Sequence, residues 1–275
     1  MGADLSQRLV PDELWELVAP LLPSFAARPQ GGGTAPCDER AVFTAVVYVL
    51  TSGCAWRRLP PTFGMSPATA HRRFAVCTEA GLWRRLHRAV LDELGARGEV
   101  DWTSAIIDAA SVRAKRGHLT GPNPVDRRVD RSKKGSKLHV LSDAQGIPLA
   151  VAVSGANLHD SQAFKPLILA IPAVRSRRGP RRRRPVKVRA DKAYFSADHV
   201  AWLRSRGLIP RIARPGIESG ERLGRHRWKI ERSIAWLFGY RRLTVRYERK
   251  GSHFLASLGL AAALTCYKKL AKITT

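Results

Sequence analysis

Ser104-Ala-Ile-Ile-Asp108 is the stretch of this 275-residue chain that decides the predicted fold. Its apolar residues are typical of a short buried strand, and the strand ends on a carboxylate. An unpaired charge beside such a strand is costly, so Asp108 needs a partner or a ligand. The run therefore predicts a central strand that presents a functional acid.

Downstream of this run the sequence alternates between strand and helix patterns. Residues 137–143 and 148–154 flank Ala-Gln-Gly-Ile and predict a hairpin, and residues 186–190 alternate apolar and basic residues as a half-buried strand does. A helix is expected from Asp160, a helix from 196 to 206, a strand from 208 to 213, and two helices from about Arg222 and Phe254. This order favours a mixed α/β sheet with flanking helices over a doubly wound parallel sheet.

Residues 1–98 show helical patterns throughout. Ser66 followed by Pro67 predicts a helix start, and the helix that follows carries Arg72 and Arg73. A helix, a turn and a basic helix outline a helix-turn-helix-like DNA reader, with a packing or dimerisation bundle as the alternative. Glycines at 95 and 98 suggest a linker, so we expect a helical DNA-binding domain at 1–98 and a catalytic domain at 99–275.

The charge of the chain points to a polyanionic partner. Lys and Arg total 48 against 22 Asp and Glu, a net charge of +26. Self-repulsion of this size favours nucleic acid as the partner. The plainer alternative is a solvated basic surface in a high-GC coding background, where Arg is over-used. Two basic segments, 113–136 and 175–184, are predicted to be loops that either contact phosphates or are solvated insertions.

The cysteine spacing and apolar runs exclude several classes. The four cysteines form no CxxC pair and no zinc spacing, which favours buried thiols in a reducing compartment. The first residues do not resemble a signal peptide. The longest apolar run, 254–267, is about 14 residues and is too short to span a bilayer. We therefore expect a cytoplasmic protein with no membrane partner.

Three carboxylates stand out as a candidate metal site. Asp108 and Asp191 each end a predicted strand, and Glu231 lies on a predicted helix, four residues after Arg227 and on the same face. Mg²⁺ prefers oxygen ligands and keeps open positions for phosphate oxygens. For each acid alone, capping or ion pairing is the plainer alternative.

Several motifs together resemble a known family. They are Trp56-Arg-x-Leu-Pro60, Ile107-Asp-Ala-x-Ser-Val-Arg-Ala114, Lys134-Gly-Ser-Lys-Leu-His139, Ala156-Asn-Leu-His-Asp160, Ala190-Asp-Lys-Ala-Tyr194 and Arg227-x-x-x-Glu231. In this order they resemble DDE transposases of the bacterial insertion-sequence-five family. One departure is clear: Gly224 and Phe238 stand where the wider glutamate signature of related families has Tyr and Lys.

The resemblance implies a fold, an activity and its residues. It implies a ribonuclease-H-like sheet in which Asp108, Asp191 and Glu231 are catalytic and bind two Mg²⁺ ions, with Mn²⁺ able to substitute. It implies cleavage of double-stranded DNA at terminal inverted repeats and strand transfer into target DNA. A homodimer or larger assembly associated with the nucleoid is expected. The expected DNA contacts are Arg72, Arg73, Lys134, Lys137, Arg227, Arg241 and Arg242.

Two other functions are compatible with the same residues. A repressor would bind specific DNA and would need no carboxylate triad. A nuclease with the ribonuclease-H-like fold would cut DNA without joining its 3′ end to a target.

Overall fold

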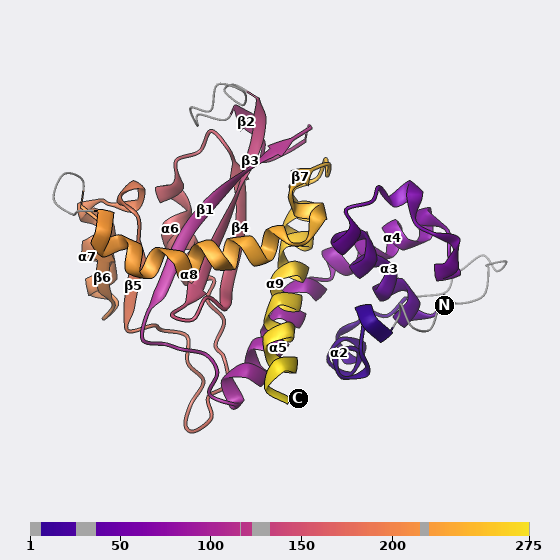
Figure 1. Cartoon of the computed structure of the whole chain (residues 1–275), viewed down its shortest axis with the longest axis horizontal. Coiled ribbons are helices and arrows are strands. Elements are labelled where there is room, and N and C mark those ends of the chain that lie inside the picture. The colour runs from indigo at the N-terminus through magenta and orange to yellow at the C-terminus, as the bar shows by residue number, and fades with distance from the viewer. Residues whose placement is uncertain (1–6, 26–36, 116, 123–132, 215–219, 275) are drawn as a thin grey trace.

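The computed structural model describes residues 7–25, 37–115, 117–122, 133–214 and 220–274, without the side chains of 220–227 (Figure 1). The α-helices are α2 (Asp12–Val18), α3 (Glu39–Ser52), α4 (Pro67–Glu79), α5 (Leu82–Ala96), α6 (Phe164–Leu169), α7 (Ala197–Ser205), α8 (Gly220–Phe238) and α9 (Gly251–Thr274). The strands are β1 (Ala105–Ala114), β2 (Gly121–Pro122), β3 (Lys134–Asp143), β4 (Pro148–Gly155), β5 (Lys187–Ala190), β6 (Ile209–Ile212) and β7 (Val245–Arg246). Short 3₁₀ turns include η2 (Trp56–Arg58), η3 (Pro61–Phe63), η4 (Asp160–Ala163), η5 (Lys192–Tyr194) and η6 (Arg241–Leu243).

The sheet is mixed, as the sequence predicted. Its main strands lie in the order β4-β3-β1-β5-β6, and β2 and β7 pair with β3 and β1 at the margin. Strand β3 is antiparallel to β1 and β4, whereas β5 is parallel to β1 and β6 is parallel to β5. An antiparallel meander continued by parallel strands, with helices around it, is a ribonuclease-H-like arrangement, and the predicted fold class is confirmed.

Strands β1 and β3 extend further than their apolar runs indicated. Arg113 in β1 pairs with Gly135 in β3, so both ends of the predicted basic loop at 113–136 belong to the sheet. Backbone hydrogen bonding continues past the apolar residues because each strand has a partner along this length. The middle of that predicted loop, residues 123–132, lies outside the described residues.

The N-terminal region is helical, and its capping residues act as predicted. Ser66 Oγ accepts a hydrogen bond of 3.1 Å from the backbone N–H of Thr69, and Pro67 begins α4. Gly53 ends α3 with a φ of 72°, a left-handed conformation that glycine adopts without a Cβ penalty. Turns η2 and η3 join α3 to α4.

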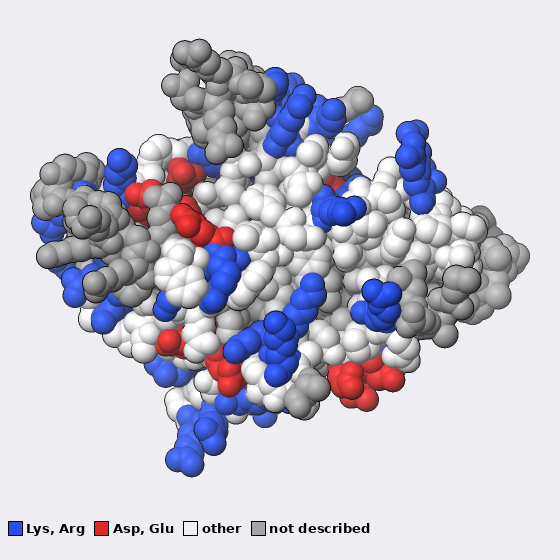
Figure 2. All heavy atoms as spheres, in the orientation of Figure 1, with Lys and Arg blue, Asp and Glu red and all other residues white. Residues whose placement is uncertain are grey.

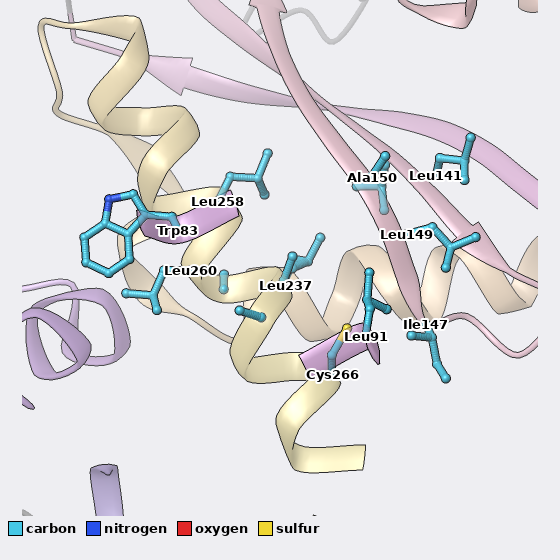
Figure 3. Close-up of a cluster of buried hydrophobic side chains, with 14 of the residues drawn as sticks. Trp83, Leu91, Leu141, Ile147, Leu149, Ala150, Leu237, Leu258, Leu260 and Cys266 are labelled. Atoms are coloured by element: carbon cyan, nitrogen blue, oxygen red, sulfur yellow. The ribbon is translucent and has the colours of Figure 1, made fainter. Parts of the chain in front are cut away.

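One hydrophobic core joins the N-terminal helices to the half that contains the sheet (Figure 3). Helices α5 and α9 pack side by side and α9 also packs against β4. Trp83 and Leu91 of α5, Leu149 of β4, Leu237 of α8 and Leu258 of α9 all belong to this core. The division at residues 98 and 99 stays a prediction, since the two parts share buried surface.

Helix α9 is the core element behind the apolar C-terminal run. Among the described residues it is the one helix whose length and composition would allow it to cross a membrane, at 24 residues. However, 67% of its most apolar window is buried inside the protein. A helix that is apolar all round and packed on several sides is a core helix, and α9 fits that description.

Candidate active site

Asp108 and Asp191 follow directly paired residues of two parallel strands. Ile107 of β1 is the register partner of Ala190 of β5, and each is followed by an aspartate. Adjacent strands lie about 4.8 Å apart, so the two aspartates leave the sheet as neighbours. Asp108 Oδ1 accepts a hydrogen bond of 2.8 Å from the Ala109 N–H, and the Asp191 carboxylate accepts one from the Lys192 N–H. Both carboxylates are thereby oriented by their own backbone.

Helix α8 lies across the face of the sheet that carries Asp108 (Figure 1). Ile106 of β1 faces Ser142 of β3 in antiparallel register. Side chains alternate along a strand, so Ile106 and Asp108 share a face with Ser142. Ser233 of α8 is fully buried, and its Oγ lies 3.3 Å from Ser142 Oγ. The helix is therefore fixed over the face from which Asp108 projects.

Glu231 lies on α8, two residues before Ser233, and its side chain is exposed. The described residues contain no group of three His, Cys, Asp or Glu side chains close enough to hold a metal ion. The structure thus brings Asp108 and Asp191 together and places Glu231 on the helix that crosses their face. It does not join the three carboxylates into one ligand set.

A buried tyrosine, Tyr194, lies in the turn after β5. Tyr194 is 1% exposed, and its backbone N–H donates 3.0 Å to the carbonyl of Asp191. Burial raises the pKa of the Tyr194 hydroxyl, and the charges of Asp160, Asp108 and Asp191 raise it further. The hydroxyl is therefore held neutral within electrostatic reach of three carboxylates.

Lys137 pairs with Asp160, one of these three carboxylates, and is withdrawn from the surface. Its Nζ lies 2.9 Å from Asp160 Oδ1 and donates 2.8 Å to the Leu158 carbonyl, and the residue is 8% exposed. The sequence predicted Lys137 as a DNA contact; its side chain is instead used inside the protein, and the predicted contact stays untested. Lys134, three residues earlier at the start of β3, is exposed.

Two adjacent arginines after α8 also differ in exposure. Arg242 is 6% exposed; its Nε donates 2.6 Å to Glu248 and its Nη1 donates 2.8 Å to the Cys54 carbonyl. The guanidinium is thus used inside the protein, and its predicted DNA contact stays untested. Arg241 is exposed. The sequence shows two equal arginines here and gives no signal of which one is buried.

The remaining predicted DNA contacts are Arg72, Arg73 and Arg227. Arg72 on α4 is exposed. Arg73 is half-buried, with Nη2 3.2 Å from Glu39 and its guanidinium 3.6 Å from the centroid of the Phe25 ring. The side chain of Arg227 lies outside the described part of α8. Arg72 is thus the better placed of the two α4 arginines for an external partner.

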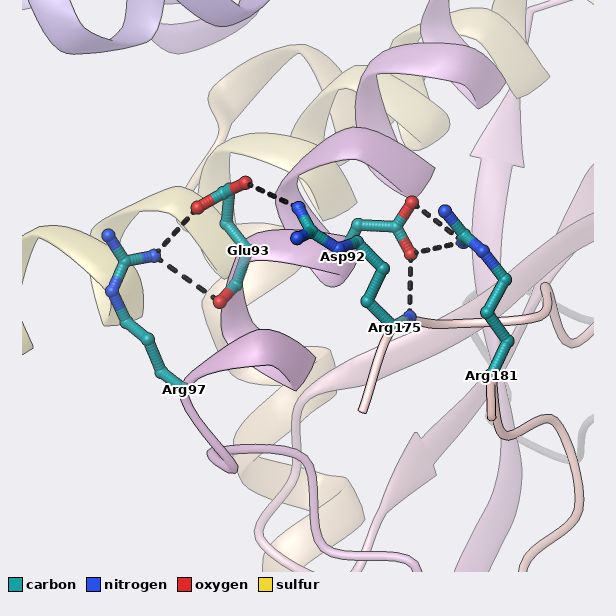
Figure 4. A network of polar contacts seen from close by, with 5 residues as sticks. All are labelled: Asp92, Glu93, Arg97, Arg175 and Arg181. Atoms are coloured by element: carbon teal, nitrogen blue, oxygen red, sulfur yellow. Dashed lines mark hydrogen bonds and ion pairs between the residues drawn. The ribbon is translucent and has the colours of Figure 1, made fainter. Parts of the chain in front are cut away.

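The basic segment 175–184 stays largely exposed, but Arg175 and Arg181 contact acidic residues of α5 (Figure 4). Asp92 accepts hydrogen bonds of 2.8 Å from the Arg175 N–H and from Arg181 Nη1. Gly95 permits this approach, because a Cβ there would lie 2.1 Å from the Arg175 carbonyl oxygen. Gly95 is therefore a contact residue within α5 and not part of a linker.

A buried arginine, Arg246, was missed by sequence reasoning. It is 0% exposed, donates 2.7 Å to Ser136 Oγ and 2.9 Å to the Leu119 carbonyl, and lies over the Phe254 ring. Burial lowers the pKa of its guanidinium. The side chain ties β7 to β3, and no spacing or composition signal separates it from the surface arginines.

The molecular surface on the α8 side contains a local acidic area. Figure 2 shows acidic side chains gathered over β1 and α6, with basic side chains around them. Neighbouring carboxylates repel one another, and a cation bound between them removes that repulsion. This arrangement suits a divalent metal, with phosphates bound by the basic surroundings.

Two sequence profiles match the chain. Residues 10–87 match one for transposases of the IS4/5 family (DUF4096), and residues 103–266 match the transposase DDE domain. The chain is 45% identical over 151 residues to the transposase assigned to insertion sequence element IS402 of Burkholderia cepacia, covering 55% of this chain and 70% of that protein. It is also 38% identical over 123 residues to a 16.2 kDa protein of the same element, covering 44% of this chain and 84% of that protein.

Solved structures of Mos1 transposase resemble the chain weakly. The pre-cleavage Mos1 transpososome has 11% identity and a TM-score of 0.27, covering 90% of this chain and 83% of that one. The Mos1 mariner paired-end complex with Mn has 13% identity and a TM-score of 0.26, covering 87% and 82%. Similarity at this level adds nothing to what the strand order already establishes.

Proposed function

The chain belongs to the DDE transposases of the IS4/5 type, enzymes that cut DNA and transfer its strands with divalent metal, and from this premise we propose Asp108, Asp191 and Glu231 as its catalytic carboxylates. The observation that carries the assignment is the register of β1 and β5, which makes Asp108 and Asp191 neighbours. Glu231 lies on helix α8, which Ser233 anchors over the face that carries Asp108.

The donor set fits a divalent metal, and we propose Mg²⁺, with Mn²⁺ as a substitute. Carboxylate oxygens on adjacent strand ends are the hard ligands that Mg²⁺ prefers. When bound, two such ions supply activation of water or of a 3′-hydroxyl and charge stabilisation at the phosphate. The protein's part is to orient Asp108 and Asp191 through the N–H groups of Ala109 and Lys192.

Recognition of DNA is proposed for the basic residues that remain on the surface. We assign the terminal inverted repeats to the N-terminal helices, with Arg72 on α4 contacting phosphates or base edges. Lys134 and Arg241 are exposed and suit phosphate contacts. Arg227 is four residues before Glu231, so it shares a helix face with that acid and suits the scissile phosphate.

We further propose a homodimer or larger assembly that works in the cytoplasm at the nucleoid. Transfer of both transposon ends to one target requires the two ends to be held together. A protein with net charge +26 is also drawn to chromosomal DNA by counterion release.

A strand-transfer assay tests the assignment. The substrate is the pair of inverted repeats that flank the coding region, with Mg²⁺ and a target plasmid. Wild type should cut and join, and Asp108→Asn should bind the ends but do neither. A DNA-binding repressor would be unaffected by Asp108→Asn, and a nuclease would cut without joining.

A further inference from the structure

The segment between α6 and β5 contains a short hairpin, residues 174–182, which we call the arginine hairpin. Val174 and Arg182 form an antiparallel bridge in which the backbone N–H of each donates 2.8 Å to the carbonyl of the other. Gly179 turns the chain with a φ of 87°, a conformation that suits glycine. Figure 1 shows the hairpin extending beyond the end of the sheet where β1 begins. A run of repeated arginines therefore has a defined backbone.

Two acids of α5 hold the arginine hairpin in place, as Figure 4 shows. Asp92 accepts a hydrogen bond from the Arg175 N–H at 2.8 Å, and both of its carboxylate oxygens accept from Arg181 Nη1, at 2.8 Å and 2.9 Å. Glu93 Oε1 lies 3.7 Å from Arg175 Nη1. The charges of these two arginines are thus balanced inside the protein, and the two residues support the hairpin.

The tip of the arginine hairpin carries cations that are not balanced in this way. Arg177 and Arg178 are exposed, and neither forms an ion pair with an acid in the part of the chain that the structure describes. Figure 2 shows basic side chains projecting at the lower edge, where Figure 1 places the hairpin. Guanidinium groups are the side chains best suited to phosphate, because their planar N–H groups bind its oxygens in pairs.

The arginine hairpin lies at the opposite end of the sheet from Lys134, a proposed contact with the transposon end. The chain that leaves the hairpin enters the sheet next to the start of β1, because the Val186 N–H donates 2.8 Å to the Trp102 carbonyl. Lys134 lies beside the end of β1, because the next residue, Gly135, pairs with Arg113. Strand β1 has 10 residues, so these two ends are about 30 Å apart.

The proposed catalytic aspartates lie between these two ends. Asp108 is the fourth residue of β1, about 10 Å from its start, and Asp191 is its neighbour on β5. Arg241 precedes β7, which pairs with the far end of β1, so it lies on the same side of the aspartates as Lys134. DNA that runs along Lys134 and Arg241 therefore meets the aspartates before it reaches the hairpin. The duplex at the hairpin is the one that lies beyond the scissile phosphate.

We propose that the arginine hairpin binds the phosphate backbone of the duplex beyond the scissile phosphate. The inference rests on the proposed function, because the aspartates define where that phosphate lies. Two duplexes with the same chemistry occupy this place in turn: the flanking DNA before cleavage and the target DNA after joining. Arginines on a fixed backbone contact phosphates without reading bases, so the hairpin holds this DNA whatever its sequence.

Equilibrium binding to three matched probes tests the proposal without divalent metal, so that cleavage and joining play no part. The first probe is an inverted repeat that stops at the cleavage position, the second continues into 15 base pairs of flanking duplex, and the third is joined through one strand to a target duplex. Wild type should bind the second or the third probe more tightly than the first. The probe that gains affinity identifies the duplex as flank or target.

The double variant Arg177→Ala/Arg178→Ala should lose this gain in affinity. On the extended probe the slope of log K against log salt should fall by about 1.8, at about 0.9 for each phosphate contact, and binding of the first probe should change less than about 2-fold. Shortening the extension locates the contact. Val186 and Asp191 are about 16 Å apart along β5, so the gain should require at least about 5 base pairs, at about 3.4 Å each.

Two further variants make the test specific. Asp92→Ala removes the support of the hairpin and no arginine; loss of an acid should tighten DNA binding through charge alone, whereas a displaced hairpin should weaken it on the extended probes. We expect weaker binding there and no loss on the first probe. Arg57→Ala/Arg58→Ala is the matched control, because it removes two adjacent exposed arginines from η2 and should leave the ratio of the affinities unchanged.

Three results would overturn the proposal. Arg177→Ala/Arg178→Ala could bind the extended probes as wild type does, it could lose as much affinity for the first probe, or Arg57→Ala/Arg58→Ala could abolish the gain equally. The second result would place the hairpin on the transposon end, and the third would reduce its effect to net charge. Failure of the proposed function has a different signature, because Asp108→Asn would then retain strand transfer whatever the hairpin binds.

Discussion

Ser233 Oγ lies 2.7 Å from the carbonyl oxygen of Gly146, and this contact fixes helix α8 against the turn between β3 and β4. A Cβ at Gly146 would lie 2.9 Å from Ser233 Oγ and 3.0 Å from the Lys229 carbonyl oxygen. Gly146 also has a φ of 91°, which other residues rarely adopt. The position of Glu231 over the sheet thus depends on a residue without a side chain.

Gly146→Ala should move α8 and reduce strand transfer at least about 10-fold, since a 1 Å displacement of catalytic groups costs up to about 100-fold in rate. DNA binding should change little, because the exposed basic residues stay in place. Gly207→Ala is the matched control: Gly207 has a φ of 70° but no heavy atom within 4 Å of the added Cβ. It introduces backbone strain alone and should leave strand transfer intact. Equal loss in both variants would contradict the role of the Gly146 contact.

Arg241→Ala should weaken DNA binding and Arg242→Ala should lower the free energy of unfolding, although the two residues are neighbours. Arg242 forms a buried pair with Glu248, and removing one partner of such a pair costs about 3–5 kcal/mol. Arg241 is exposed, so its loss should leave the free energy of unfolding nearly unchanged and weaken DNA binding. Urea unfolding and DNA titration of both variants measure the two effects. A stable Arg242→Ala variant with weakened DNA binding would restore Arg242 as a DNA contact.

Lys134→Ala should reduce the salt dependence of DNA binding, and Lys137→Ala should not. One lost phosphate contact lowers the slope of log K against log salt by about 0.9. Lys137 forms an ion pair with Asp160 and donates a hydrogen bond to the Leu158 carbonyl. Its removal should therefore lower the free energy of unfolding instead. Affinities measured from 50 to 200 mM salt give both slopes. Identical slopes for Lys134→Ala and wild type would remove Lys134 from the DNA interface.

Asp143 should make the protein less stable as pH rises from about 4 to 7. Burial raises the pKa of its carboxyl from 3.8 to about 6, partly offset by hydrogen bonds from the N–H groups of Asp101, Ile147 and Gln145. The folded state therefore binds the proton more tightly than the unfolded chain. This contribution is fully present below pH 3.8 and is lost as pH rises through 6, by about 3 kcal/mol.

Urea unfolding of Asp143→Asn between pH 4 and 8 checks this sign, because the variant should lose that part of the pH dependence. Its amide N–H₂ would also face the Asp101 N–H, which the wild-type carboxylate accepts at 2.9 Å, so a net loss of about 1–3 kcal/mol is expected at low pH. Asp198→Asn is the control: Lys165 lowers the pKa of that exposed carboxyl, so any change should have the opposite sign. A pH profile of Asp143→Asn that matches wild type would show that Asp143 does not titrate in this range.

The sequence predicted the sheet well because its strands are marked by local patterns. Ser104 to Asp108 and the alternating run before Asp191 need only apolar periodicity to be recognised, and the hairpin after Asp143 needs only its Gly turn. Once the fold class is predicted, β1 is expected to pair with β5. That pairing alone makes Asp108 and Asp191 neighbours. Local patterns could not show the length of β1, because its last residues are held by hydrogen bonds to β3.

The sequence could not predict which individual basic residues are buried and which are exposed. Lys134 and Lys137 belong to one motif, and Arg241 and Arg242 are adjacent, yet one of each pair is exposed and the other is buried with an acid. Which residue is buried depends on Asp160 and Glu248, whose proximity arises only in the folded chain. The packing of Arg175 and Arg181 on Asp92 has the same origin, since those partners are over 80 residues apart in sequence.

The hydrogen bond from Arg242 to the Cys54 carbonyl has a mechanical consequence. It links the residues just after α3 to the turn η6 that follows α8, and α5 and α9 pack against each other across the same division of the chain. Cutting the polypeptide near residue 98 would expose apolar surface on both fragments and remove the Cys54 acceptor of Arg242 in the larger one. The two pieces should therefore be insoluble when expressed apart and should recover a native state only when they are refolded together.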